Sequence, residues 1–109
     1  MITLKEYINE EYLTKNKNEI KTQLDKFLYD MSWHESVGFE STEECNFIID
    51  KLQSEYNFKS TKSYDSCRKT STIILKGKTQ KEHINMTLEF YPNGDEYNEE
   101  PWCDLRDAK

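Results

Sequence analysis

Two histidines and three cysteines, which could supply the nitrogen and sulfur ligands of a zinc site, are spread through this 109-residue chain: His34, Cys45, Cys67, His83 and Cys103. Structural zinc sites use ligands in close pairs, such as two cysteines separated by two residues. None of the five residues forms such a pair. The sequence leaves open whether Cys67, His83 and Cys103 meet in space, but nothing in their spacing requires it. We therefore predict no zinc site.

Oxygen ligands for calcium are dense in one segment, at Asp95, Asn98, Glu99 and Glu100. Their spacing is not that of the EF-hand loop, which has fixed ligand positions and a central glycine. We predict that the protein holds no metal and no cofactor.

Motifs for nucleophilic catalysis and phosphate binding are also missing. His34 and Glu35 begin like the HExxH motif of zinc proteases, but Gly38 stands where the second histidine is needed. The chain has only three glycines and contains no GxSxG, P-loop or GxGxxG sequence. We predict that the protein is not an enzyme.

Charge is distributed unevenly along the chain. Residues 57–81 hold seven bases and one acid, Asp65, a net charge of +6. Residues 82–105 hold seven acids and no Lys or Arg, a net charge of −7. The bases are Lys59, Lys62, Arg68, Lys69, Lys76, Lys78 and Lys81, and the acids are Glu82, Glu89, Asp95, Glu96, Glu99, Glu100 and Asp104. Such segregation creates a local field that selects partners by charge.

Pairing between neighbouring strands accounts for part of this segregation. A hairpin linked by residues 77–81 would bring three lysines of the basic stretch close to Glu82 and Glu89. Opposite charges that face each other across two strands contribute about 0.2–1 kcal/mol per pair. The lysines concerned are Lys76, Lys78 and Lys81. The acids from 95 to 104 lie beyond this hairpin, so we expect them to lack local partners.

Aromatic residues are interleaved with these acids. Tyr91, Tyr97 and Trp102 are of the types that anchor protein interfaces, and carboxylates around them attract a basic partner. The alternative is an ordinary solvated tail, with Trp102 folded back on the helices. We predict a partner-binding site made of Glu89, Tyr91, Asp95, Glu96, Tyr97, Glu99, Glu100, Trp102 and Asp104.

Composition limits the other possible partners. The net charge of −6 argues against unassisted binding to nucleic acids or anionic membranes. No apolar run is long enough for a membrane span or a signal peptide, and the odd number of cysteines suits reduced thiols. We predict a cytoplasmic protein. The alternative is a nucleic-acid-binding domain that uses the basic stretch 57–81, with Phe58 and Tyr64 as stacking rings.

The first half of the chain has helical patterns. Thr3 with Glu6, and Ser41 with Glu44, have the spacing of capping boxes. Three apolar stripes recur at helical spacing. They are Leu4, Ile8 and Tyr12; Ile20, Leu24, Phe27, Leu28 and Met31; and Cys45, Ile48, Ile49, Leu52 and Tyr56. We expect three helices, the second ending near Gly38. A single bent helix across the first two stripes is the alternative.

The second half has strand patterns. Ile84, Met86, Leu88 and Phe90 alternate with polar residues, and residues 56–60 and 70–76 are also predicted strands. Residues 92–95 predict a turn, after which 96 and 97 would begin a last short strand, followed by a polar tail from 101. Helices followed by strands indicate an α+β fold. We predict one domain over residues 1–109, with two to three N-terminal helices packed on a small antiparallel sheet of three to four strands.

These features favour a small acidic binding protein without catalysis. In size, polarity and lack of motifs, the chain resembles small phage-encoded anti-defence proteins such as the anti-CRISPR inhibitors. This resemblance implies an inhibitor that blocks the basic nucleic-acid-binding surface of a bacterial defence nuclease. Carboxylates on one face of a strand are about 6.6 Å apart, similar to successive phosphates, so mimicry of nucleic acid is geometrically possible. Bacterial immunity proteins, which neutralise basic nuclease toxins, are similar in the same respects and remain an alternative.

Overall fold

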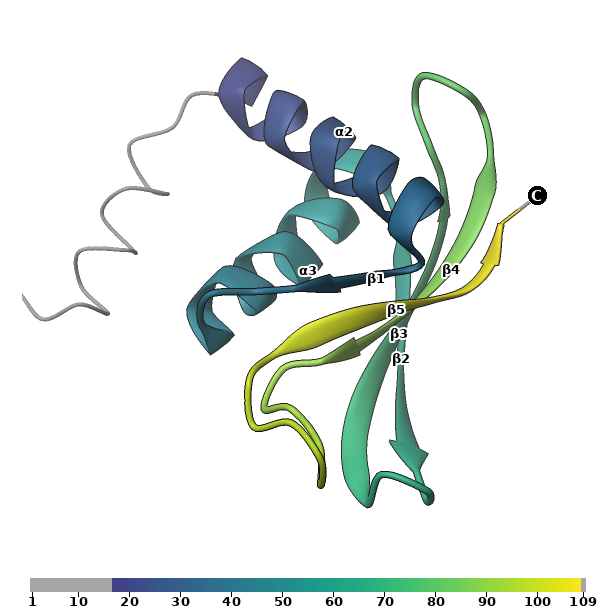
Figure 1. The fold of residues 1–109 in the computed structure, drawn as a ribbon. Helices are drawn as coiled ribbons and strands as arrows, with labels where there is room; N and C mark the ends of the chain where they lie inside the picture. The colour runs from purple at the N-terminus through teal and green to yellow at the C-terminus, as the bar shows by residue number, and fades with distance from the viewer. Residues whose placement is uncertain (1–16, 109) are drawn as a thin grey trace, which may run out of the picture.

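A computed structural model describes residues 17–108 and shows an α+β fold, with two helices followed by most of a five-stranded antiparallel sheet. The helices are α2 (Lys17–His34) and α3 (Thr42–Tyr56). The strands are β1 (Ser36–Gly38), β2 (Lys59–Asp65), β3 (Thr70–Lys78), β4 (Asn85–Tyr91) and β5 (Trp102–Ala108). Both helices lie on the same side of the twisted sheet (Figure 1).

The two helical stripes that fall within the described residues are confirmed. Every residue of the stripe from Ile20 to Met31 is buried in α2, and every residue of the stripe from Cys45 to Tyr56 is buried in α3. The predicted cap of α3 forms as well: the Ser41 hydroxyl oxygen accepts a hydrogen bond from the Glu44 amide at 3.1 Å. The expected helix at residues 3–12, and the alternative of a single bent helix, fall outside the described residues.

The second helix ends earlier than expected. It stops at His34 rather than near Gly38, because Glu35 adopts a left-handed conformation with φ of 62°. The chain then forms β1, a strand of three residues that is too short to show any periodicity in the sequence.

The sheet has five strands in the order β1-β5-β4-β3-β2, so the prediction of three to four strands is wrong. The expected polar tail is β5, and it lies in the interior of the sheet between β1 and β4. Its sequence is polar because only Cys103 and Leu105 pack in the core, while Asp104 and Arg106 lie on the other face. Residues 96 and 97, expected to begin a strand, lie instead in the loop between β4 and β5.

The two faces of the sheet have different chemistry. The face toward the helices contributes apolar residues to the core, including Leu75, Met86, Leu88 and Phe90. On β4, Glu89 and Tyr91 point to the opposite face, which no described helix covers, and yet both are buried. We call this second face the open face. Its polar side chains must therefore be shielded by one another.

The three cysteines are all free and lie in different environments. Cys67 is exposed in the turn between β2 and β3, whereas Cys45 and Cys103 are buried. Burial raises the pKa of the Cys45 thiol to about 12, and it raises the pKa of Cys103 well above its usual range. At neutral pH both buried thiols therefore stay protonated and are unreactive as nucleophiles.

We expect one thiol of the native protein to react quickly with a chromogenic thiol reagent, and all three to react after unfolding without reductant. The Cys67→Ser variant should lose the fast phase and keep two thiols in the unfolded state. Rapid reaction of a second thiol in the native protein would contradict the buried positions of Cys45 and Cys103, and a single thiol after unfolding would reveal a disulfide.

Candidate functional site

A buried carboxylate lies at the centre of the open face. Glu89 is only 5% exposed, and its charge is paired with Arg106 of β5, whose Nε donates to Oε1 at 2.5 Å. The Thr72 hydroxyl of β3 donates to the other carboxylate oxygen at 2.7 Å. A buried charge is tolerated only when it is paired and hydrogen-bonded. Glu89 meets this condition within its own chain, so a partner is not needed to neutralise it.

An aromatic stack continues this network toward the edge of the sheet. The rings of Tyr91 and Trp102 lie face to face, with centroids 4.1 Å apart and an interplanar angle of 3°. The Arg68 guanidinium lies over the Trp102 ring at 5.0 Å. The Tyr91 hydroxyl donates to Asp65 Oδ2 at 2.8 Å, and this hydrogen bond lowers the pKa of Asp65. Burial raises the pKa of Tyr91, so the phenol remains a donor.

Asp95 organises the loop between β4 and β5, residues 92–101, which we call the Tyr97 loop. Its Oδ1 accepts the backbone amides of Tyr97 and Asn98 at 2.9 and 2.7 Å, and its Oδ2 accepts Arg68 Nη1 at 3.0 Å. The Asp95 side chain is 1% exposed. Burial alone would raise its pKa, but the amides of Asn98 and Tyr97 and the Arg68 ion pair outweigh this effect, so the pKa is lowered.

Backbone contacts close the same loop. Gly94 has φ of 74°, and a Cβ at this position would overlap the backbone of Asn98 and Glu99. The Gly94 amide donates to the Tyr91 carbonyl at 3.1 Å, and the Glu96 amide donates to the Arg68 carbonyl at 3.1 Å. The loop is therefore held to β4 and to the turn between β2 and β3 rather than hanging free as a tail.

The nine predicted partner-binding residues fall into two groups. Glu96, Tyr97, Glu99 and Glu100 are exposed on the Tyr97 loop, and Tyr97 is 75% exposed. The remaining five form or adjoin the network that supports this loop: Glu89, Tyr91, Asp95, Trp102 and Asp104. The structure thus gathers the predicted residues around one loop but presents only four of them to solvent.

The expectation that the acids from 95 to 104 lack local partners is wrong for three of them. Asp95 pairs with Arg68, Glu96 Oε1 lies 3.5 Å from Lys69 Nζ, and Asp104 Oδ2 lies 3.5 Å from Arg106 Nη1. The error arises because Arg68 and Lys69 reach the acids from the β2–β3 turn, and Arg106 reaches them from β5, which the sequence predicts as a polar tail. Among the described residues, only Glu99 and Glu100 of this group have no ion pair.

The expected cross-strand pairing in the hairpin is also wrong. Lys76 faces Thr87 and Lys78 faces Asn85 across β3 and β4. Lys81 lies in the loop that follows β3, where its Nζ is 4.0 Å from Asp25 Oδ2 of α2. Glu89, which the sequence paired with these lysines, uses Arg106 instead. The register of the strands decides these neighbours, and it is not visible in the charge pattern alone.

The residues that sequence analysis missed are Asp65, Arg68, Thr72 and Arg106. Each belongs to the open-face network through a partner on another strand or in another turn. The one local signal was the alternation of Trp102, Asp104 and Arg106, which places all three on one face of a strand.

No group of three metal-binding side chains occurs among residues 17–108. Cys67 and His83 lie beyond opposite ends of β3, a nine-residue strand, so they do not meet. Within the described part of the chain, no helix is long and apolar enough to cross a membrane. Comparison with protein-family models, curated proteins and solved structures finds no match for this chain.

Replacement of Asp95 tests how much this one carboxylate contributes to the stability of the protein. We expect Asp95→Ala to lower the free energy of unfolding at pH 7 by about 1–3 kcal/mol, since it removes charged hydrogen bonds. The unfolding free energy of Asp95→Asn should lie between those of wild type and Asp95→Ala, because an amide oxygen still accepts the two backbone amides but no longer forms the ion pair with Arg68. Urea unfolding measures both.

The effect should depend on pH in a defined direction. The folded-state pKa of Asp95 is lowered, so its ionisation stabilises the fold above its ordinary pKa of about 4 and loses this effect as pH falls through the folded value. The gap in unfolding free energy between wild type and Asp95→Asn should therefore be constant near neutral pH and shrink below about pH 4. Glu99→Gln, a matched change at an exposed carboxylate, should stay within about 0.5 kcal/mol of wild type. An equal gap at pH 7 and pH 3 would contradict the assignment.

Proposed function

We propose that the protein is a non-catalytic binding protein that docks the Tyr97 loop on a basic surface of another protein. The observation that carries this proposal is a tyrosine that is 75% exposed in a loop fixed by Asp95, Arg68 and Gly94. Tyrosine is among the residue types that dominate binding energy. A loop already held in one conformation also loses less entropy on binding than a mobile one.

Electrostatics supports a basic partner. Glu99 and Glu100 have no ion pair among the described residues, and the Glu96–Lys69 pair is exposed, with side chains 42% and 68% accessible. Exposed pairs of this kind contribute little to stability, so Glu96 is available to a partner. Carboxylates around an aromatic anchor accelerate encounter with a positive surface and disfavour a negative one.

The partner that best fits this chemistry is a nucleic-acid-binding enzyme. Proteins that hold nucleic acid do so through grooves rich in Lys and Arg. An acidic protein seated in such a groove competes with the nucleic acid and inhibits the enzyme. We propose an inhibitor of a bacterial defence nuclease, in the manner of anti-CRISPR proteins; an immunity protein against a nuclease toxin would use the same electrostatics.

Site-specific crosslinking tests this proposal. A photoreactive phenylalanine analogue at position 97 should capture a basic protein in bacterial cells. The same analogue at position 64, where the native tyrosine is also exposed, should not capture that protein. With the captured partner purified, the combined replacement of Glu96, Glu99 and Glu100 by Lys should slow association at low salt. Tyr97→Ala should mainly speed dissociation, because anchor residues act on the bound state.

A matched charge reversal separates local from global effects. Replacing Glu19, Asp50 and Glu55 by Lys changes the net charge by the same amount but on the two helices. This control should change binding much less than the loop reversal. Equal effects of both reversals would show that net charge, rather than the Tyr97 loop, attracts the partner. Unchanged affinity in the loop reversal would remove the loop from the interface.

A second candidate function is nucleic-acid binding through lysines on β2 and β3. Lys59 faces Lys76 directly across these strands, and Lys78 follows two residues later on the same face. All three are exposed and have no ion pair among the described residues. Like charges that face each other on neighbouring strands are destabilising. A surface that keeps such a pair is therefore a candidate for binding phosphates.

Fluorescence anisotropy with labelled single-stranded and duplex DNA decides between the two candidates. At low salt we expect no binding at micromolar protein, because the net charge of −6 and the acidic Tyr97 loop repel phosphates. Micromolar binding that weakens steeply with salt, and that is lost in Lys59→Glu/Lys76→Glu but kept in Lys17→Glu/Lys26→Glu on α2, would favour the lysine face instead.

A further inference from the structure

Two large aromatic side chains lie exposed on α2. Trp33 is 69% exposed and Tyr29 is 57% exposed, and their ring centroids are 6.2 Å apart, one helical turn along the same face. The other tryptophan, Trp102, is stacked within the protein. Adjacent exposed rings of this size are uncommon on a surface that serves only for solubility, and Trp and Tyr are enriched where partners bind.

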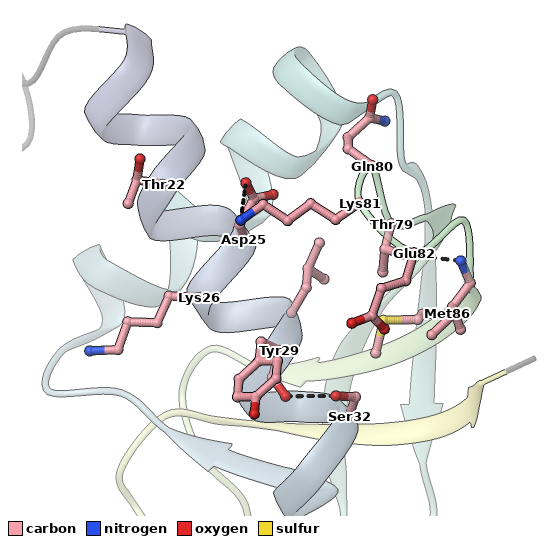
Figure 2. A pocket seen from close by; sticks show the side chains of 12 residues that line it. Thr22, Asp25, Lys26, Tyr29, Ser32, Thr79, Gln80, Lys81, Glu82 and Met86 are labelled. Carbon is pink, nitrogen blue, oxygen red and sulfur yellow. Dashed lines mark hydrogen bonds and ion pairs between the residues drawn. The ribbon is translucent and has the colours of Figure 1, made fainter.

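A groove adjoins these rings. It has a volume of about 320 Å³ and lies between α2 and the loop that joins β3 to β4 (Figure 2). Leu28, Ile84 and Met86 give it an apolar lining, and Tyr29 forms one end. At the other end, the Lys81–Asp25 contact joins the loop to the helix. The size and the apolar lining suit one or two large apolar side chains.

The charges around the groove and the rings favour a basic segment. Glu82 lines the groove, and Asp30 lies about one helical turn before Trp33 on α2. Neither carboxylate has an ion pair among the described residues. Lys26 is the lining cation that lacks an ion pair within residues 17–108, and Figure 2 shows its side chain directed away from the loop. The faces of Tyr29 and Trp33 also attract cations.

We infer that Tyr29, Trp33 and the adjoining groove form a second protein-binding surface, which takes an amphipathic segment of a partner protein. Apolar side chains of this segment fill the groove, and a Lys or Arg beside them contacts the two rings and Glu82. This surface is separate from the Tyr97 loop. The groove lies at the start of β4, the Tyr97 loop follows its end, and the seven residues of this strand span about 23 Å between them. The inference of this second surface therefore does not depend on the proposed function of the Tyr97 loop.

Three peptides of equal length test this inference. The first is a short amphipathic helix with leucines along one face and lysines along the other. The second has the same composition in an order that gives leucines no common face. The third is the amphipathic peptide with glutamates in place of lysines. Labelled peptides give dissociation constants by anisotropy, and amide and indole N–H shifts in NMR spectra locate the contact.

The first peptide should bind saturably and shift the signals of Trp33, Tyr29, Ile84 and Met86. Trp33→Ala should weaken binding at least about tenfold, as loss of an anchor does, and Glu82→Lys should weaken the first peptide while improving the third. Tyr64→Ala removes an equally exposed tyrosine from β2 and should leave binding unchanged. These variants change exposed side chains, so their thermal unfolding should match wild type.

Several results would overturn the inference. Equal binding of the first two peptides would show attraction of lysine by net charge alone, without use of the groove. Tighter binding of the glutamate peptide would show that the surface attracts an acidic segment rather than a basic one. Shifts confined to the Tyr97 loop, or binding unaffected by Trp33→Ala, would place the contact elsewhere. A concentration-dependent dimer that Trp33→Ala abolishes would mean that a second copy of this chain covers the rings.

Discussion

The ion pair between Glu89 and Arg106 holds the open face of the sheet together. A carboxylate that is 5% exposed would be strongly destabilising without a cation. The cation comes from β5, so the pair forms only when the last strand is inserted between β1 and β4. Removal of Arg106 would leave the buried Glu89 carboxylate without a cation, whereas Arg106, whose side chain is 44% exposed, could still be solvated if Glu89 were removed. This constraint links β4 to β5, the strand that the sequence predicts as a polar tail.

The same constraint determines the shape of the candidate site. Once β5 lies beside β4, Trp102 faces Tyr91 in the strand register and the two rings stack. Arg68 then covers Trp102 and reaches Asp95, which holds the amides of the Tyr97 loop. The carboxylates buried in this chain of contacts serve the structure. The carboxylates left in solvent, on Glu96, Glu99 and Glu100, are those that a partner can meet.

The exposed aromatic residues are divided between regions of opposite or mixed charge. Tyr97 is surrounded by acids on the loop, Tyr64 lies on the strand that carries Lys59 and Lys62, and Tyr29 with Trp33 borders the groove on α2. A small protein with a 35% hydrophobic composition has few large side chains to spare from its core. Their exposure at several sites supports the proposal that the surface of the protein, rather than an enclosed cavity, carries its function.

The sequence by itself determined the elements whose signal is local. The stripes of α2 and α3, the cap at Ser41 and the alternation of Met86, Leu88 and Phe90 repeat at the period of the structure that they form, so they identify both the element and its buried face. The sequence also located the aromatic and acidic segment around Tyr97. Only the tertiary structure decided which of those residues are exposed, that β1 and β5 are strands, and that Trp33 is left in solvent. The deciding pairs, Arg68 with Asp95 and Glu89 with Arg106, are 27 and 17 residues apart. Such contacts depend on strand order and register, which are set by the packing of the whole sheet and leave no periodic signal in the chain.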